Sequence, residues 1–219
     1  MSDNAFVHVR DLRVVFRRDG QTINAVNGVS FDVQKGEVMA LIGESGSGKS
    51  VTLRALMRLH PPGSSELSGT LRVGDDAVLT MSASQLRRYR GGRCAMIFQE
   101  PLLAFDPVYT VGQQIIEGLR RHEGLSRQAA RDRALEALRQ VRIPSPERRL
   151  DAYPHEMSGG MRQRAMIALA LSCNPQLLLA DEPTTALDAT VQIQILILLR
   201  DQQKQRGLSI VFVTHDIGA

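Results

Sequence analysis

Residues 43–50, with the sequence GESGSGKS, constrain the fold of this chain more than any other stretch. They match the pattern G-x-x-x-x-G-K-[ST], whose glycines let successive backbone N–H groups point at phosphate oxygens without a Cβ in the way. Lys49 can reach the β- and γ-phosphates of a nucleotide, and the Ser50 hydroxyl can bind Mg²⁺. From average composition, a chance match in a chain of this length has a probability on the order of one per cent. The pattern therefore predicts a phosphate-binding loop rather than an ordinary turn.

The flanks of this loop fit the same interpretation. Residues 37–42 (EVMALI) predict a buried strand that enters the loop, and residues 51–57 predict a helix that leaves it. The N-terminus of that helix would point at the phosphates and favour their negative charge. The residues expected around the phosphates are Gly43, Glu44, Ser45, Gly46, Ser47, Gly48, Lys49, Ser50 and Val51.

Composition limits the remaining classes of protein. The chain has 219 residues, 43% hydrophobic and 23% charged, which is typical of a globular protein with a sizeable core. No apolar run approaches the roughly 20 residues of a membrane helix, and the start lacks the pattern of a signal peptide. We therefore expect any membrane role to come through a partner. Cys94 and Cys173 lack metal-ligand spacing and predict free core thiols in a reducing compartment.

Basic charge is carried almost entirely by arginine, and the net charge is +4. Arginines cluster at positions 87, 88, 90 and 93, which permits a nucleic-acid patch. No aromatic residues interleave with them for base stacking, so a solvated basic face is the favoured interpretation.

The remaining patterns predict an α/β fold with a parallel-sheet core. Residues 6–33 look β-rich, with Asp19-Gly20 as a turn signal, and residues 69–78 predict a second hairpin. Residues 100–157 read as a helical insertion. Expected after it are a buried helix at 160–172, an apolar strand at 177–180, a helix from Asp188 and a strand at 209–214.

Polar residues follow three of the predicted core strands. Gln99 follows a strand at residues 93–98, Asp181 and Glu182 follow the next, and His215 follows the last. Because ligands of open parallel sheets bind at the carboxyl ends of the strands, we expect these side chains to converge on one nucleotide.

The chemistry of these four side chains indicates separate roles. Asp181 suits Mg²⁺ held through water, and Glu182 is the natural base for an attacking water. Gln99 can contact Mg²⁺ or the water, and His215 can hydrogen-bond the γ-phosphate and the water. For any one of them alone, the alternative is a surface polar residue after a strand.

Ser158, Gly159 and Gly160 open the predicted buried helix. Free N–H groups at a positive helix end favour a second anion site, although a plain helix cap is the alternative. A second site needs its own ligand, and the nucleotide of another copy of the chain would supply one.

The order of these motifs resembles the ATP-binding subunit of ATP-binding-cassette (ABC) transporters over nearly the whole chain. The motifs are residues 43–50, Gln99, residues 157–161 (MSGGM), residues 177–182 (LLLADE), residues 186–188 (ALD) and His215. The resemblance implies a P-loop NTPase (RecA-like) parallel-sheet core, an N-terminal antiparallel β subdomain and an α-helical subdomain at about residues 100–157. It implies one ATPase domain over residues 1–219, truncated at its C-terminus because family members continue further.

The same resemblance implies how ATP and Mg²⁺ are bound and hydrolysed. Two subunits would form a head-to-tail dimer with two ATP molecules between them. Ser158, Gly159 and Gly160 would serve the partner's γ-phosphate, and Asp188 would lie at the dimer interface. Phe16 occupies the place of the aromatic residue that stacks on adenine, with a core phenylalanine as the alternative.

A subgroup is also indicated. Residues 98–101, 153–164 and 181–188 resemble the importers of oligopeptides, dipeptides, glutathione and nickel. Met161 departs from the general family's Gln but is similar to this subgroup. Met157 replaces the more usual Leu, an apolar change that we expect to be tolerated.

Partners and location follow from the resemblance alone. It implies a second ATPase subunit, two transmembrane permease subunits and an extracytoplasmic solute-binding protein, with this chain peripheral to the cytoplasmic face of the bacterial inner membrane. Residues 104–107 (AFDP) depart from the subgroup's Ser-Leu-Asn-Pro near the place where the family docks its permease. The solute itself is left open.

Two other functions compete with transport. A soluble ABC-type ATPase of nucleic-acid repair or translation usually carries long insertions or tandem cassettes, and the subgroup motifs argue against it, so nucleic acid is not an expected partner. A regulatory module without turnover is disfavoured by Glu182, because inactive cassettes commonly lose this base.

Overall fold

The structure is a computed structural model that describes residues 5–18, 20–185 and 187–215. It divides into two compact units, the first formed by Met1–Arg87 with Ser209–Ala219 and the second by Arg88–Leu208. Asp19, predicted to form a turn with Gly20, lies outside the described residues, as do Met1 and Ala219. Among the described helices, none combines the length and apolar character needed to span a membrane.

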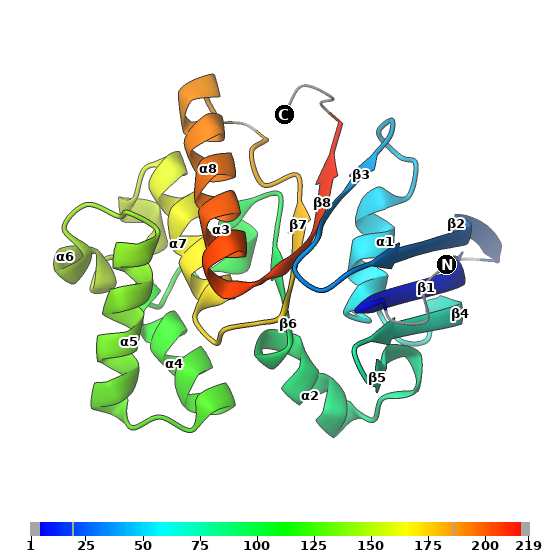
Figure 1. Ribbon diagram of the computed structural model, residues 1–219, viewed down its shortest axis with the longest axis horizontal. Coiled ribbons are helices and arrows are strands. Elements are labelled where there is room, and N and C mark those ends of the chain that lie inside the picture. Colours follow the sequence, from blue (N-terminus) through cyan, green and yellow to red (C-terminus); the bar gives the residue numbers. More distant parts are fainter. Residues whose placement is uncertain (1–4, 19, 186, 216–219) are drawn as a thin grey trace. The chain divides into compact units, whose positions relative to one another are not determined.

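An antiparallel sheet in the first unit has the strand order β2-β1-β4-β5 (Figure 1). Its strands are β1 (Val7–Arg18), β2 (Gln21–Val33), β4 (Ser65–Val73) and β5 (Asp76–Ala77). The predicted second hairpin is confirmed as β4 and β5, although β4 begins earlier than expected, at Ser65, because it pairs with β1 over nearly its whole length.

A bulge in β1 keeps the apolar side of this strand buried. Val7, Val9, Leu12 and Val14 are all buried, so the alternation of side chains changes between Val9 and Leu12. The register with β2 shifts at the same place, where Asp11 has a φ of 45°. An extra residue in one strand re-aims the side chains that follow it, and here it returns Leu12 and Val14 to the core.

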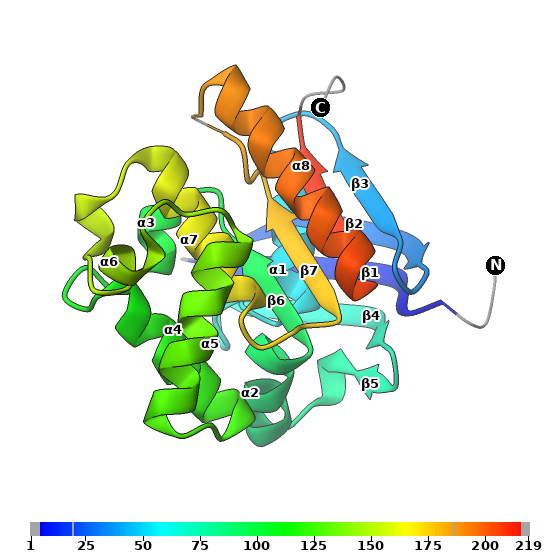
Figure 2. The same cartoon turned by 60° about the vertical axis from the view of Figure 1, so that its left-hand side comes forward.

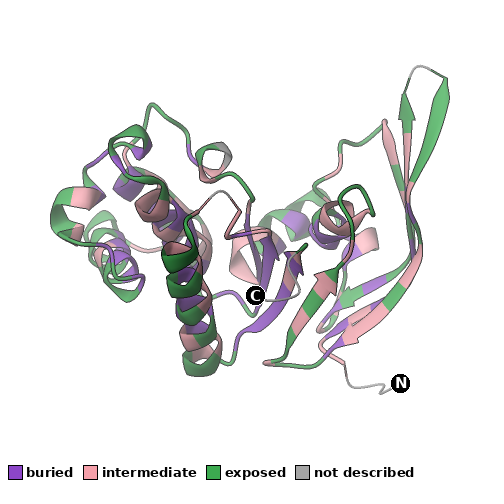
Figure 3. Ribbon diagram, turned by 90° about the horizontal axis from the view of Figure 1, so that it is seen from above, coloured by how far each residue is buried: buried purple, intermediate pink, exposed green. Residues whose placement is uncertain are grey.

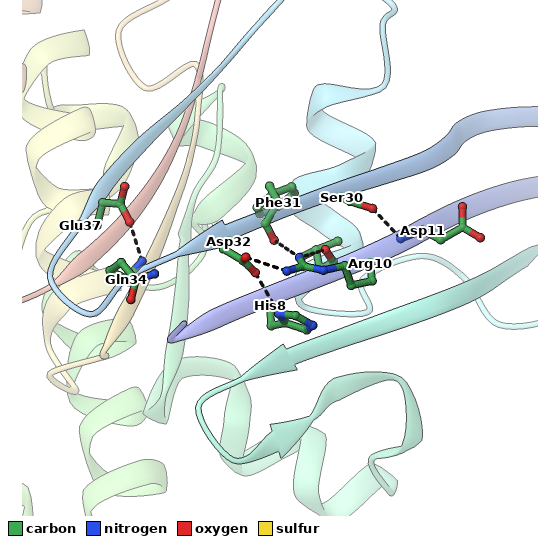
Figure 4. A network of polar contacts seen from close by, with 9 residues as sticks. His8, Arg10, Asp11, Ser30, Phe31, Asp32, Gln34 and Glu37 are labelled. Atoms are coloured by element: carbon green, nitrogen blue, oxygen red, sulfur yellow. Dashed lines mark hydrogen bonds and ion pairs between the residues drawn. The ribbon is translucent and has the colours of Figure 1, made fainter. Parts of the chain in front are cut away.

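Polar contacts fix the register of β1 and β2 beside this bulge (Figure 4). His8 lies opposite Asp32, with 2.9 Å between its Nδ1 and the carboxylate. Arg10 donates to the other carboxylate oxygen at 2.6 Å and also to the carbonyl of Phe31. The hydrogen bond from Arg10 lowers the pKa of Asp32, and that from His8 acts in the same direction.

The phosphate-loop strand belongs to the first unit as well. β3 (Val38–Ile42) pairs in parallel with β8 (Ser209–Thr214), so that Ile42 lies opposite Thr214. α1 (Lys49–Leu56) follows the loop and contacts β1, β2 and β8 through a buried side that includes Leu53 and Leu56. The predicted strand, loop and helix are therefore present in the expected order. The strand is not buried as predicted, because Val38 and Ile42 are each 53% exposed.

The chain then passes from the first unit into the second. η1 (Val78–Thr80) is a short 3₁₀ turn, and α2 (Ala83–Gly92) follows it across the boundary between the units. α2 is kinked at Arg90 and Gly91, where Gly91 has a φ of 86°.

Two parallel strands in the second unit are buried along their whole length (Figure 3). β6 (Cys94–Ile97) pairs with β7 (Leu177–Asp181). Both cysteines are free, as predicted; Cys94 is buried, and burial raises the pKa of its thiol to about 12. Cys173 is only half-buried and is therefore not the core residue that the sequence predicts.

Helices make up the rest of the second unit (Figure 2). α7 contacts α3, α4, α5 and β6, which explains why its sequence is apolar on nearly every side after Arg164. The elements between residues 100 and 157 are helical, although their treatment as a separate subdomain remains a prediction. The bounds are α3 (Pro101–Ala104), α4 (Val111–Glu123), α5 (Arg127–Gln140), α6 (Pro146–Leu150), η2 (Pro154–Glu156), α7 (Gly159–Leu171) and α8 (Ala189–Arg206).

Two glycines of α4 should respond in opposite ways to alanine. At Gly112 an added Cβ would lie 2.4 Å from the carbonyl oxygen of Leu150, whereas at Gly118 it would meet nothing within 4 Å. We expect Gly112→Ala to lower the free energy of unfolding by ~1–3 kcal/mol, because backbone must move. Gly118→Ala should raise it by up to about 1 kcal/mol through helix propensity. Urea unfolding measures both changes, and equal midpoints for the two variants would contradict this account of the packing.

Candidate functional site

The phosphate loop of the first unit depends on glycine at Gly48. Gly46 and Gly48 have φ values of 83° and 89°, in the left-handed region that favours glycine. A Cβ at Gly48 would also lie 2.4 Å from the carbonyl oxygen of Ala25, so the backbone could not approach this closely with any other residue. Gly48 immediately precedes α1, and the loop therefore ends at the N-terminus of a helix, where an anion is favoured.

Lys49 lies against the loop that precedes it. Its Nζ donates to the carbonyl oxygens of Gly43 and Glu44, both at 2.7 Å, and is 3.4 Å from the Ser47 hydroxyl. The Ser47 N–H in turn donates to Glu44 at 3.2 Å. The ammonium group is therefore held at the loop, beside the helix end that would receive a phosphate.

Phe16, on β1, is in the same unit as the phosphate loop and is half-buried. Its ring packs edge-on against His60, with the centroids 5.3 Å apart. His60 also lies 2.9 Å from the carbonyl oxygen of Val51 in α1, and burial lowers the pKa of its imidazole. A neutral imidazole that donates Nε2–H to this carbonyl fits both observations.

In the second unit, the structure brings Gln99 and Glu182 together. Gln99 follows β6 and donates from Nε2 to a carboxylate oxygen of Glu182 at 3.2 Å. The hydroxyl of Thr185 donates to the same oxygen at 3.0 Å. Asp181, at the end of β7, is 1% exposed, whereas Glu182 is half-buried. The two carboxylates that the sequence singles out thus have different surroundings although they are adjacent.

Glu182 has an unusual backbone conformation. Its φ of 44° lies in the left-handed region, which is uncommon for a residue other than glycine. Pro183 follows it, and a residue before proline normally adopts extended backbone. Such a conformation persists only where the surroundings hold it, and it is often found at functional sites.

The predicted second anion site begins a real helix. Ser158 is the N-cap of α7, and its side chain accepts from the Met161 N–H at 3.4 Å. A Cβ on Gly160 would lie 3.0 Å from Val191, but one on Gly159 would meet only Leu187, at 3.9 Å. The capping role left open by the sequence is therefore present, and it does not conflict with an anion at the same helix end.

Asp188 is also a helix cap. Its carboxylate accepts from the Val191 N–H at 3.0 Å, as expected for the start of α8. Ala186, which belongs to the same motif, lies outside the described residues.

The candidate ligands of Mg²⁺ are distributed over both units. Ser50 is in the first unit, and Gln99 and Asp181 are in the second. Their hydroxyl, amide and carboxylate oxygens are the donors that Mg²⁺ prefers. Within the described ranges, no group of three or more His, Cys, Asp or Glu residues could hold a metal ion by itself. His215 is exposed after β8, in the unit of the phosphate loop.

Two glutamines near Glu182 were not identified from the sequence. Gln163 is buried in α7 and donates to the carbonyl of Pro183. Gln192, in α8, donates to the carbonyls of Thr184 and Leu187 at 3.1 and 3.2 Å. Little in the sequence signals either glutamine, because Gln163 stands between two arginines and α8 holds several other polar residues. Burial of the Gln163 amide, which requires a partner, is visible only in the structure.

Comparisons with known proteins agree on one family. The family model described as "ABC transporter" matches residues 26–185. A peptide import ATP-binding protein of Brucella abortus (strain 2308) is 50% identical over 97% of this chain, which covers 64% of that protein. The oligopeptide transport ATP-binding protein OppD of Bacillus subtilis is 50% identical over 97% of this chain, which covers 60% of that protein. The chain thus spans less than two thirds of the length of these relatives.

A solved structure supports the same relationship. The dimeric post-hydrolysis state of an ATP-binding cassette bound to ADP and Pi is 29% identical to this chain, with a TM-score of 0.84. The similarity covers 97% of this chain and 89% of that one. The predicted fold class, an α/β P-loop NTPase with a parallel-sheet core and an N-terminal antiparallel sheet, is confirmed.

The cap at Asp188 can be separated from any interface role by two substitutions. Asp188→Ala removes the acceptor for the Val191 N–H, and we expect it to lower the free energy of unfolding by about 1 kcal/mol. Asp188→Asn keeps an acceptor and should stay within about 0.5 kcal/mol of the parent. Denaturant unfolding of the monomer measures both, and equal losses for the two variants would show that the cap contributes nothing.

Proposed function

The chain belongs to the ABC transporter family, and we propose that it is the ATP-binding and ATP-hydrolysing subunit of an importer for peptides or related small solutes. The observation that carries this proposal is the 50% identity, over 97% of the chain, to peptide and oligopeptide transport ATP-binding proteins. The alternative function in nucleic-acid repair or translation has no support from these relatives. The ATP-hydrolysing role is further supported by similarity to a cassette bound to ADP and Pi.

In the proposed mechanism, the first unit binds the triphosphate. The N–H groups of the loop and the N-terminus of α1 surround the β- and γ-phosphates, and Lys49 exchanges its carbonyl partners for phosphate oxygens. The ring of Phe16 stacks on adenine. His215 donates to the γ-phosphate.

The second unit supplies the hydrolytic groups. Glu182 accepts a proton from the attacking water and orients it. Ser50, Gln99 and Asp181 would hold Mg²⁺, which neutralises charge on the β- and γ-phosphate oxygens when bound. Gln99 connects the two roles, because its amide contacts Glu182 at 3.2 Å and is also a proposed ligand of Mg²⁺.

The proposed assembly is a head-to-tail dimer of ATPase subunits. Ser158, Gly159 and Gly160 of one subunit serve the γ-phosphate held by the other, and Asp188 lies at the interface. Residues 1–219 act as one ATPase domain with a helical subdomain at about residues 100–157. Two permease subunits and a solute-binding protein complete the importer, with this chain peripheral to the cytoplasmic face of the inner membrane.

Lys49→Ala should lower ATP affinity at least tenfold. The substitution removes the cation that faces the β- and γ-phosphates, and a charged hydrogen bond contributes ~1.5–3 kcal/mol. Calorimetry with Mg²⁺ and ATP measures the change, and urea unfolding verifies that the variant is folded. Unchanged affinity in the folded variant would contradict the assignment of the loop.

Glu182→Gln should retain ATP binding and lose most hydrolysis. The amide keeps the size and polarity of the carboxylate but cannot accept the proton of water, a role that contributes roughly 10²–10⁴-fold to a rate. Single-turnover release of inorganic phosphate measures the loss. A rate equal to that of the parent would exclude Glu182 as the base.

The importer assignment is tested by copurification with a membrane permease. The full-length subunit, tagged and expressed in its native host, should bring down two integral membrane subunits, and ATP hydrolysis by the reconstituted complex should rise when a peptide-loaded binding protein is added. The Glu182→Gln complex serves as the inactive control. Copurification of nucleic-acid repair or ribosomal proteins without a permease would overturn the proposal.

A further inference from the structure

The turn that follows β7 is held by glutamine side chains from two helices. Gln163 of α7 donates to the carbonyl of Pro183, the residue after Glu182. Gln192 of α8 donates to the carbonyls of Thr184 and Leu187. The position of the Glu182 backbone is therefore set by helices as well as by its own strand.

Gln163 is the more deeply placed of the two glutamines. Its exposure is 1%, and it lies in a helix whose other buried residues include Ala165, Met166 and Ile167. A buried amide is costly unless it is hydrogen-bonded, and an apolar residue of similar volume would pack here without that cost. The presence of an amide at this place is explained by the carbonyl that it satisfies.

The Pro183 carbonyl directly follows Glu182, whose backbone conformation is unusual. Glu182 has a left-handed φ of 44° and precedes a proline, a combination that needs support from outside. The Thr185 N–H donates to the Glu182 carbonyl at 3.2 Å, and the Thr185 hydroxyl binds the carboxylate. Gln163 fixes the peptide between these two contacts, at Pro183.

We propose that Gln163 is a positioning residue, which holds the turn so that the carboxylate of Glu182 keeps the place needed to act on the attacking water. The inference rests on the proposed function, in which Glu182 is the base. Without the amide, the Pro183 carbonyl loses its hydrogen bond from Gln163, and the turn can shift to another conformation. Small displacements of a catalytic group have large effects on rate.

The same contact links Glu182 to the start of α7. Gln163 lies three residues after Gly160 and four after Gly159, so all three share one side of the helix. That side packs on the same segment, because Gly159 and Gly160 face Leu187 and Val191. The helix end proposed to receive the partner's phosphate thus belongs to the same helix that holds the turn after the proposed base.

Gln163→Met tests the proposal, because it keeps the volume of the side chain and removes the donor. Gln202→Met is the matched control. Gln202 is also buried, at 3% exposure, but its amide oxygen accepts a hydrogen bond from Arg206, which lies outside the turn after β7. Both substitutions are made in the full-length subunit, alone and together with Glu182→Gln. The measurements are ATP affinity, single-turnover phosphate release and urea unfolding.

We expect Gln163→Met to slow phosphate release about tenfold or more while ATP affinity changes less than about twofold. Gln202→Met should keep both its phosphate-release rate and its ATP affinity within about twofold of the parent. In the Glu182→Gln background, Gln163→Met should have almost no further effect, since a residue that acts only through Glu182 has nothing left to position. A purely structural role of Gln163 would instead slow phosphate release by the same factor in the parent and in the Glu182→Gln background.

Three results would overturn the inference: an unchanged rate in Gln163→Met, an equal loss in both backgrounds, or an equal loss in Gln202→Met. If Gln163→Met does not fold, Gln163→Asn, whose amide is one methylene short of the carbonyl, is compared in the same way. A parent protein that releases no phosphate would overturn the proposed function and the inference with it. An active parent with an equally active Gln163 variant would overturn the inference alone.

Discussion

Strands that are buried on both faces can carry polar side chains only where they end, and this constraint organises the chemistry of the second unit. β6 and β7 are buried throughout, and Gln99, Asp181 and Glu182 occupy the first polar positions at their ends. Because the two strands run parallel and in register, Gln99 and Glu182 meet at 3.2 Å. In the first unit, β8 is largely buried and leads into His215, whereas β3, which leads into the phosphate loop, is partly exposed.

Features that depend on local backbone chemistry could be predicted from the sequence. The phosphate loop is one of them, since Gly48 is required by its own left-handed φ and by the nearby Ala25 carbonyl. Helix starts at Ser158 and Asp188 are others, because a cap needs only a side-chain acceptor and an N–H three residues later. The start of β4 at Ser65 was missed because pairing with β1, and not its own pattern, decides where this strand begins.

Features that depend on distant parts of the chain could not be predicted. Gln163 is visible in the sequence between two arginines of α7, but its acceptor, the carbonyl of Pro183, is twenty residues away. The left-handed conformation of Glu182 runs against the preference of a residue before proline, and no local pattern indicates it. The packing of Gly160 on Val191 is likewise decided by the approach of α8 to α7.

The backbone conformation of Glu182 places stability in opposition to the role proposed for its side chain. A non-glycine residue in the left-handed region carries a conformational penalty of roughly 1–2 kcal/mol. Glycine would therefore adopt the φ of 44° at this position at a lower free-energy cost than the proposed base, Glu182. Replacement by glycine would relieve this penalty but remove the carboxylate, so under the proposed mechanism the less active subunit would be the more stable one. If Glu182 is the base, stability and activity make opposite demands on this one residue. The contacts that offset the penalty are those of Gln99 and Thr185 with its carboxylate and that of Gln163 with the next carbonyl, at Pro183.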